Sequence, residues 1–450
     1  MSLHCSGWCR LASSALLTSR SRSVPSVGKF QSLDGLRAIA IILVFFHHVK
    51  DHIPPVVPAV KFFQYYVWQG WIGVDLFFVL SGFLITGLLI DSREATNYLS
   101  GFYGRRILRI FPLYYSVLIG AIVTSQILTS VHAPQAPAVA ALVPLPQDRW
   151  VYLSFLTNWT GLWAAQWDSS FRSILAHFWS LAVEEQFYFV WPFIVWVVRP
   201  RAVPWIAGIV AGLSAIIRLA WVLHWGTGIV APQSVEIQLA TICRLDGLFI
   251  GALCAYFYRD PKLMLRIRKW LPSVAALGVG SYLLVFSGML FFPQRTRLLL
   301  YGPAPSVFHS LGDATVLVLL CGGYSLLALG FGALVLLAAY TERDGSLMQR
   351  LLQSRVLAPI GKYSYGIYVF HIPIIVLANT FLFPRLSAQS GSDGALTECA
   401  YIVVLAAASF SIAAISYELF EKKILRFKRY FEPKYAPVVS DALAEMNPAD

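Results

Sequence analysis

Charged residues are scarce in this chain of 450 residues: only 13% are Asp, Glu, Lys or Arg, against about 25% in an ordinary soluble domain. Cysteine is also sparse. The six thiols show neither a CxxC pair nor a Cys/His zinc spacing, so we expect free thiols and no metal. The Walker A, GxGxxG, HExxH and GxSxG motifs are all missing. These absences exclude a soluble enzyme built around any of those sites.

Apolar residues are abundant instead: 57% of the chain is hydrophobic, and the mean hydropathy is +0.64. Ten apolar runs approach the length of about 20 residues that crosses a bilayer. We therefore predict an all-α fold, a polytopic transmembrane bundle of about ten helices with no separate soluble domain. The predicted spans are 37–55, 68–91, 107–129, 176–198, 204–224, 236–258, 270–292, 312–340, 356–383 and 398–420.

The net charge of +12 would suit a nucleic-acid partner, but the basic residues lie between the apolar runs. Cytoplasmic loops of membrane proteins collect Lys and Arg in this way. If the proline-broken segment 137–165 does not cross and the N-terminus is inside, 25 of the 35 basic residues lie on the inner side and 7 on the outer side. We therefore predict ten crossings, cytoplasmic termini, and the lipid bilayer rather than nucleic acid as a partner.

The two ends of the chain differ from its apolar centre. Residues 1–30 hold four basic side chains, eight serines and no acid, a composition that fits a disordered basic arm, a transit peptide or an over-extended gene start. Residues 426–450 are polar and are expected to form a cytoplasmic tail. The transmembrane domain is predicted over residues 31–425.

Ionisable residues within the spans are candidates for function, because each costs about 2.5 kcal/mol or more to place in a bilayer. A bundle also keeps some of them as buried ion pairs that fix helix register, so that alternative stays open for part of the set. The set comprises His48, Asp75, His177, Glu184, Glu185, Arg218, His224, Arg244, Asp246 and His371.

Arg37 and His48 share one face of the first span. Their offset of eleven residues is three helical turns, or about 16 Å at 1.5 Å per residue. One helix thus carries a cation near the cytoplasmic edge and an imidazole deep in the membrane. A hydrogen-bonded helix contact is the alternative interpretation of His48.

Three arginines, Arg105, Arg106 and Arg109, lie where the third span leaves the cytoplasm. Arginine binds phosphate oxygens in a bidentate manner, so the cluster is a candidate anion site, although basic residues are common at any inner boundary. The preceding span holds Asp75 and Ser81 among glycines that permit close helix packing.

The stretch HFWSLAVEEQFYFVWP (177–192) places His177, Glu184 and Glu185 in an otherwise apolar aromatic span. A carboxylate beside an imidazole fixes its tautomer and strengthens it as a general base. The expected depths of Glu184 and His48 can match, so we predict that one of the two glutamates orients His48.

The sequence resembles the acyltransferase-3 family of integral-membrane acyltransferases. The resemblance extends over residues 30–425 and is carried by SLDGLRAIAIILVFFHH (32–48), GVDLFFVLSGFLIT (73–86), FYGRRILRIFPLYY (102–115), HFWSLAVEEQFYFVWP (177–192), RLDGLFIGAL (244–253) and GKYSYGIYVFHIPI (361–374). It implies acylation, often acetylation, of hydroxyls on exported glycans or related small molecules, in the inner membrane of a bacterium. It also implies that residues 31–425 form a transmembrane acyltransferase domain.

The family's motifs fall on individual residues of this chain. Its Arg-ten-residues-His signature falls on Arg37 and His48, its Arg-x-x-Arg signature on Arg106 and Arg109, and its glutamate on Glu184. Some members carry an extracytoplasmic esterase-like domain, which has no counterpart here, so we expect direct transfer by the membrane domain.

We combine these features in one hypothesis: acyl-CoA, most simply acetyl-CoA, binds from the cytoplasm with its phosphates near the basic residues. His48 then acts on the acceptor hydroxyl as general base or transient acyl carrier. The expected residues are His48, Glu184 and Glu185 for catalysis, Arg37, Arg105, Arg106 and Arg109 for the donor, and Asp75, Ser81, His177, Arg244, Asp246 and His371 for the acceptor or for support. A transporter of glycans or lipid-linked sugars is the alternative, and a catalytically dead sensor is a third.

Overall fold

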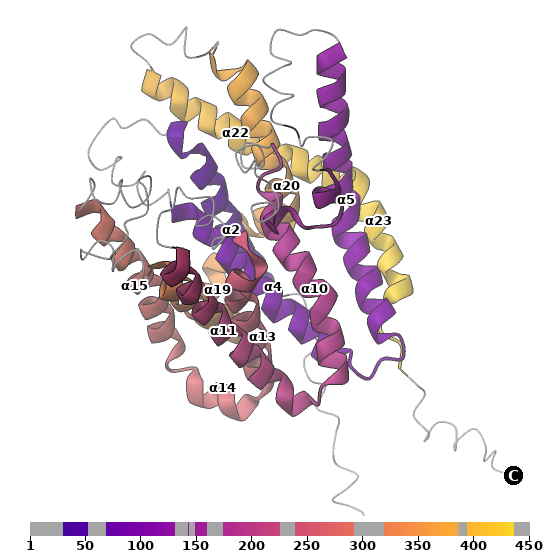
Figure 1. Ribbon diagram of the computed structural model, residues 1–450, viewed down its shortest axis with the longest axis vertical. Coiled ribbons are helices and arrows are strands. Elements are labelled where there is room, and N and C mark those ends of the chain that lie inside the picture. The colour runs from indigo at the N-terminus through magenta and orange to yellow at the C-terminus, as the bar shows by residue number, and fades with distance from the viewer. Residues whose placement is uncertain are drawn as a thin grey trace, which may run out of the picture.

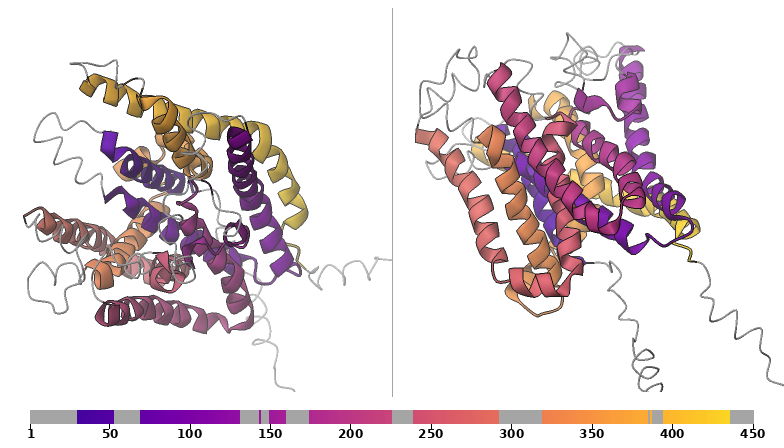
Figure 2. Two further views of the ribbon diagram at one scale, coloured as in Figure 1. Left: turned by 45° about the horizontal axis from the view of Figure 1, so that its top comes forward. Right: turned by 60° about the horizontal axis from the view of Figure 1, so that its bottom comes forward.

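The computed structural model describes residues 30–52, 69–130, 143, 149–159, 174–225, 239–291, 319–384, 386 and 394–435. Within these ranges the chain forms helices and no strand, and the long helices pack side by side in a bundle (Figures 1 and 2). The predicted all-α fold is therefore confirmed. Cys5 and Cys9, the side chain of His224, and most of the segment 137–165 lie outside the described residues.

Ten long helices correspond one to one with the ten predicted spans. They are α2 (Gln31–Val49), α4 (Ile72–Asp91), α5 (Tyr98–Ser130), α10 (Phe178–Val197), α11 (Val203–Trp225), α13 (Thr241–Arg259), α15 (Leu271–Phe291), α18 (Tyr324–Tyr340), α20 (Leu357–Phe381) and α22 (Gly394–Ser416). Eight segments of the described chain are long and apolar enough to cross a membrane. The remaining two helices are α10, which carries the polar run Glu184–Gln186, and α15. The chain is a multi-pass membrane protein.

Short elements connect these helices. They are η1 (Lys50–His52), η2 (Gln69–Trp71), α7 (Arg149–Leu153), η4 (Thr157–Trp159), η5 (Pro200–Ala202), α14 (Pro261–Ile267), η6 (Leu319–Gly323), α19 (Leu347–Leu352), η8 (Tyr417–Glu421), α23 (Lys422–Leu425) and η9 (Arg426–Phe431). Of the segment 137–165, the structure describes α7, η4 and their flanking residues, and these two helices of five and three residues are far too short to cross a bilayer.

Burial separates central from peripheral helices. In the most apolar stretch of α4, 78% of the residues are buried inside the protein, whereas in that of α5 only 22% are. Helix α4 packs closely on α13 through two glycines: a Cβ on Gly82 would lie 1.9 Å from the carbonyl oxygen of Leu248, and one on Gly251 would lie 2.1 Å from that of Val79. Small residues allow such backbone contact, which is the main source of helix association in lipid.

Replacing Gly82 with alanine should destabilise the protein, because the new methyl group must push the α13 backbone away. We expect a loss of about 1–3 kcal/mol, the usual cost of overpacking, measured by thermal unfolding in detergent. A methyl group added at Gly120 on α5 would have no neighbouring atom within 4 Å, so Gly120→Ala is the matched control and should be neutral or stabilising. Equal melting temperatures for the two variants would contradict the close contact.

The C-terminal part of the fold runs back along the peripheral helix α5. After α22 the chain continues through η8, α23 and η9, which lie beside α5 in both Figure 1 and Figure 2. Residues 426–435, which the sequence analysis assigned to the tail, include η9 and hydrogen bonds to the start of α5. This arrangement brings a second set of basic residues to the end of α5 that carries its arginines.

Candidate active site

Three histidines from three helices meet inside the bundle. His48 lies near the end of α2, His177 at the start of α10 and His371 in α20. The ring of His371 lies 5.0 Å from that of His48 and 5.1 Å from that of His177, centroid to centroid. His177 and His371 are buried, whereas His48 is partly accessible. We call these three residues the histidine cluster.

The tautomer of each ring follows from its backbone partner, because a carbonyl oxygen can only accept a hydrogen bond. His48 Nδ1 lies 2.8 Å from the Val44 carbonyl, and His371 Nδ1 lies 2.6 Å from the Tyr368 carbonyl. His177 instead donates from Nε2 to the Val369 carbonyl at 3.2 Å. In neutral rings, the lone pairs are therefore on His48 Nε2, His371 Nε2 and His177 Nδ1. Of these three atoms, His371 Nε2 and His177 Nδ1 are buried and have no hydrogen-bond partner within the described structure.

Two hydroxyl groups lie beside the histidine cluster. Tyr368 donates to the His177 carbonyl at 2.7 Å, so its oxygen accepts from the Ser180 hydroxyl, which lies 2.5 Å away. The Tyr368 ring also contacts His177 and His371. Tyr368 is near enough to Glu184 to interact with it electrostatically. The tyrosine therefore lies beside the histidine cluster and within electrostatic range of Glu184.

Glu184 and Glu185 point to different neighbours, as adjacent residues of a helix must. The Tyr188 hydroxyl donates to Glu184 Oε2 at 2.7 Å, and Ser81 of α4 lies near Glu184. Glu185 lies near Arg106, and its buried Oε1 has no hydrogen-bond partner among the described residues. Both glutamates are partly accessible as whole residues.

The structure gives His48 Nδ1 a backbone partner rather than a glutamate. The backbone carbonyl of Val44, one turn earlier on α2, takes the Nδ1 proton instead. Glu184 lies close enough to Arg37 and Arg106 to interact with both. The physical reason is local: the i−4 carbonyl is always within reach of a side chain that folds back along its own helix.

The predicted basic residues gather near the carboxylates. Arg106 interacts electrostatically with Arg37 and Arg109 as well as with Glu185, and its guanidinium lies over the Tyr188 ring. Arg37 is paired with Asp34 at 2.6 Å. Arg105 donates to the carbonyl of Phe431 instead. The structure therefore joins Arg37, Arg106 and Arg109 in one region and places Arg105 beside it.

One face of α4 runs past both the carboxylates and the histidine cluster. Within Ile72–Leu89 the partly accessible residues are Phe77, Ser81, Leu84 and Leu88, and all the others are buried. The spacing of four, three and four residues forms a single stripe along the helix. Ser81 meets Glu184 and the Phe77 ring meets Tyr368, so this stripe extends from the carboxylates towards the histidine cluster.

Two buried ion pairs contain the remaining candidates. Arg244 of α13 pairs with Asp75 of α4 among aromatic rings, of which that of Tyr324 lies 4.2 Å from its guanidinium carbon. Arg218 of α11 pairs with Asp246 of α13 at 2.7 Å and also binds Ser325 at 2.7 Å. Each pair joins two helices that cross near each other. This is the register-fixing arrangement that the sequence analysis kept as an alternative.

Replacing Asp246 with asparagine should destabilise the protein by about 3–5 kcal/mol, because Arg218 would keep an uncompensated buried charge. The expected readout is a lower melting temperature and less folded protein on size-exclusion chromatography. The double variant Arg218→Leu with Asp246→Leu should recover part of that loss, since no lone charge remains. A stable, inactive Asp246→Asn protein would contradict a structural role and favour contact with substrate.

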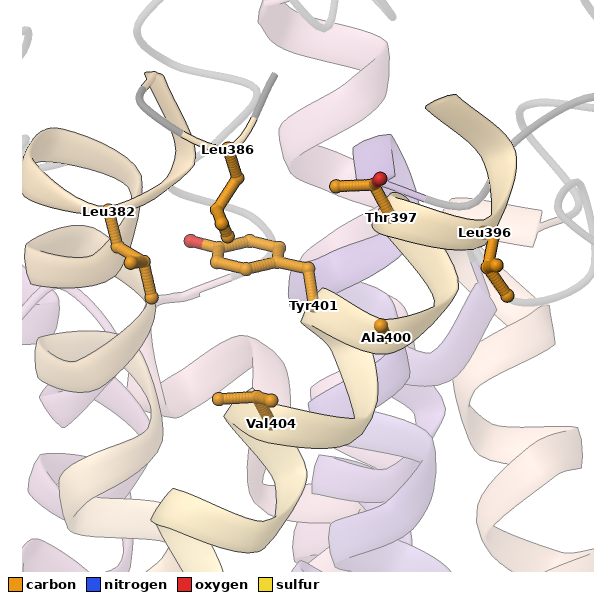
Figure 3. A pocket seen from close by; sticks show the side chains of 7 residues that line it. All are labelled: Leu382, Leu386, Leu396, Thr397, Ala400, Tyr401 and Val404. Atoms are coloured by element: carbon orange, nitrogen blue, oxygen red, sulfur yellow. The ribbon is translucent and has the colours of Figure 1, made fainter. Parts of the chain in front are cut away.

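Two hollows are lined by residues other than those of this polar region. One of about 320 Å³ lies between the end of α20 and α22, and its side chains, such as Tyr401 and Leu386, contain no ionisable carboxylate, histidine, lysine or arginine (Figure 3). The other, of about 490 Å³, lies between α5 and α20 and includes Phe370 and Pro373, which flank His371. Both linings are mainly apolar and offer no catalytic base.

Sequence reasoning missed several polar partners, chiefly Tyr188, Ser180 and Tyr368. Tyr188 lies one turn after Glu184, and Tyr368 lies one turn before His371. The signal that could have revealed them is therefore the i, i+3 and i, i+4 spacing around residues already selected. Tyrosines in aromatic spans are also common packing residues, and this obscured the signal.

Comparison with known proteins identifies the family. A family model described as an acyltransferase domain matches residues 30–418. The chain belongs to this acyltransferase-3 family. The match includes every residue of the histidine cluster, both glutamates and the arginines of α2 and α5.

Similar curated proteins are bacterial O-acetyltransferases. The O-acetyltransferase OatA of Staphylococcus aureus is 26% identical over 417 residues, which cover 89% of this chain and 58% of that protein. The peptidoglycan O-acetyltransferase OatA of Listeria monocytogenes is 27% identical over 419 residues, which cover 89% and 57%. The chain thus spans less than three fifths of the length of these relatives. No solved structure matches this chain.

Proposed function

We propose that this protein is a membrane O-acetyltransferase that moves an acetyl group from acetyl-CoA to a hydroxyl of a cell-envelope glycan. The observation that carries the proposal is the histidine cluster, whose unpartnered ring nitrogens lie at one end of a row of polar side chains. Glu184, Tyr188 and the arginines lie at the other end. The accessible stripe of α4 supports a route between the two ends.

The donor enters at the basic end of the bundle. Arg37, Arg106 and Arg109 lie there, and guanidinium groups bind phosphate oxygens in pairs. The distribution of Lys and Arg among the loops supports a cytoplasmic position for this end, which is where acetyl-CoA is made available. With its phosphates at the arginines, the thioester extends along α4 towards the histidine cluster.

The chemical step uses the free Nε2 of His48. As a general base it removes the proton of the acceptor hydroxyl while the oxygen attacks the acetyl carbonyl; the C–S bond breaks, and the thiolate of CoA takes up a proton. The imidazolium so formed lies against the ring of His371, which in turn lies against the ring of His177. As a nucleophile, His48 would instead carry the acetyl group briefly before the hydroxyl arrives.

Isotope exchange separates these two mechanisms. Purified protein is incubated with unlabelled acetyl-CoA and labelled CoA in the absence of any acceptor. An acyl carrier passes its acetyl group back to labelled CoA, so labelled acetyl-CoA accumulates. A general base has no acetylated intermediate and gives no exchange. We expect His48→Ala to abolish whichever reaction the wild type shows.

The acceptor belongs to the cell envelope in this proposal, because the relatives are named as O-acetyltransferases and one as a peptidoglycan O-acetyltransferase. A direct test is mass spectrometry of envelope glycans from cells with and without this protein. Cells that express it should gain alkali-labile acetyl esters on a sugar. Glycans that are identical in both strains, with acetyl-CoA still consumed, would move the acceptor to another class of hydroxyl.

A further inference from the structure

The C-terminal segment, residues 431–434, is fixed by side-chain contacts to the start of α5 and to the residue just before it. The Arg105 guanidinium donates to the carbonyl of Phe431, and the ring of Phe431 covers Gly104 so closely that a Cβ there would lie 2.1 Å from it. Asn97 donates to the carbonyl of Glu432 at 2.8 Å and accepts from the backbone N–H of Lys434 at 2.8 Å. The register of η9 along α5 is therefore fixed.

This register places Lys428 among the arginines of α5. Lys428 is half-buried and interacts electrostatically with Arg109, Arg106 and Arg105. The next residue, Arg429, is exposed and lies against the ring of its neighbour Tyr430. One basic residue of η9 thus faces α5, and the adjacent one faces away.

The four cations have carboxylates nearby but form no salt bridge with them in the described part of the chain. Glu184 and Glu185 lie near Arg106, and two further carboxylates lie near the other arginines of α5: Glu421 near Arg109 and Glu432 near Arg105. Among the described residues, the buried Nε of Arg106 also has no hydrogen-bond partner. Like charges brought together in a partly buried site repel each other unless an anion binds between them.

We propose that Lys428 is a donor-binding residue that completes a phosphate site with Arg105, Arg106 and Arg109. The ligand class is a polyanion with several phosphate groups, such as the nucleotide part of acyl-CoA, and in this respect the inference rests on the proposed function. Lysine provides a mobile point charge beside the rigid guanidinium forks, which suits a second phosphate on the same ligand.

The main test compares two acetyl donors in nanodiscs made of phosphatidylcholine. Acetyl-CoA carries phosphates, whereas S-acetylpantetheine carries the same thioester without any phosphate. For Lys428→Ala we expect the KM for acetyl-CoA to rise about tenfold or more, as for the loss of a charge-assisted contact, with kcat nearly unchanged. The kinetics with S-acetylpantetheine should not change. Arg429→Ala is the matched control and should behave as the wild type with both donors.

Several outcomes would overturn the assignment. An unchanged KM for acetyl-CoA in Lys428→Ala would remove Lys428 from the donor site. An equal loss with both donors would make Lys428 a structural residue. A lipid headgroup offers the same phosphate chemistry, so binding of labelled CoA is also measured in phosphatidylglycerol nanodiscs. If anionic lipid displaces CoA, and does so less in Lys428→Ala, the occupant is a lipid.

The binding measurement also separates this inference from the proposed function. A wild-type protein that binds CoA through Lys428 but transfers no acetyl group would overturn the function and leave the phosphate site. A wild-type protein that transfers acetyl from acetyl-CoA without any contribution from Lys428 would leave the proposed function and overturn the phosphate site. If the wild-type protein binds no CoA, both are overturned.

Discussion

Replacing His48 with alanine should abolish acetyl transfer while leaving an inserted, folded protein. His48 supplies the one ring of the histidine cluster that is partly accessible, and its Nε2 has no hydrogen-bond partner among the described residues. Loss of a general base typically costs about 10²–10⁴ in rate. Its only described hydrogen bond is to a carbonyl of its own helix, so the fold depends little on it. The rate is measured with labelled acetyl-CoA, and folding by thermal unfolding.

His52 is the matched control for this variant. Its ring lies against Phe383 and Tyr401 rather than against the histidine cluster, at 4.5 and 5.1 Å between centroids. His52→Ala should therefore keep most of the transfer rate. Substantial activity in His48→Ala, or an equal loss in both variants, would remove His48 from the mechanism.

Replacing Arg106 with alanine should have the second largest effect. Arg106 is the residue that contacts both regions of the donor path, because it lies near Arg37 and Arg109 on one side and near Glu185 and Tyr188 on the other. Its removal takes away a phosphate partner and leaves the two carboxyl groups without their nearest cation. We expect kcat/KM for acetyl-CoA to fall about 10²-fold, from about 1.5–3 kcal/mol for each charged hydrogen bond lost.

Arg106→Lys and Arg201→Ala are informative controls. Lysine keeps the charge but not the planar fork, so activity should be intermediate. Arg201 is exposed on η5, outside the polar region of the bundle, and its replacement should have no effect on transfer. If Arg106→Ala retains normal kcat/KM for acetyl-CoA, the phosphates of the donor bind elsewhere.

The fold was largely predictable because a bilayer limits the choice of structure. Every predicted span corresponds to a helix, since apolar runs of membrane length have one way to satisfy their backbone hydrogen bonds. Helix ends were less predictable. The first helix begins at Gln31 rather than at residue 37, because the sequence around Asp34 and Arg37 is polar but still helical.

The membership of the site was easier to predict than its pairings. The sequence selected His48, His177 and His371, and the structure brings these three together. A single sequence does not give the rotational orientation of each packed helix about its axis, so the partner of His48 could not be derived. The expected depths of Glu184 and His48 in the membrane were similar, but in the packed structure Glu184 lies beside Tyr188 and Ser81.

The ion pairs illustrate the same limit. Asp75, Arg218, Arg244 and Asp246 were all singled out as costly charges in the membrane. The structure pairs them across helices, and the separation differs widely: Asp75 and Arg244 are 169 positions apart, whereas Arg218 and Asp246 are 28 apart. Charge alone shows that a partner is needed, whereas the identity of the partner depends on which helices pack together.

Inverted membrane vesicles provide the most direct test of the central claim, because they expose the cytoplasmic face to an added donor. Acetyl-CoA labelled in the acetyl group is supplied, and label in alkali-labile esters of envelope glycan is counted for the wild type and for His48→Ala. We predict ester label with the wild type and none with the variant. Equal labelling in both, or movement of glycan across the vesicle membrane without any use of acetyl-CoA, would contradict the account.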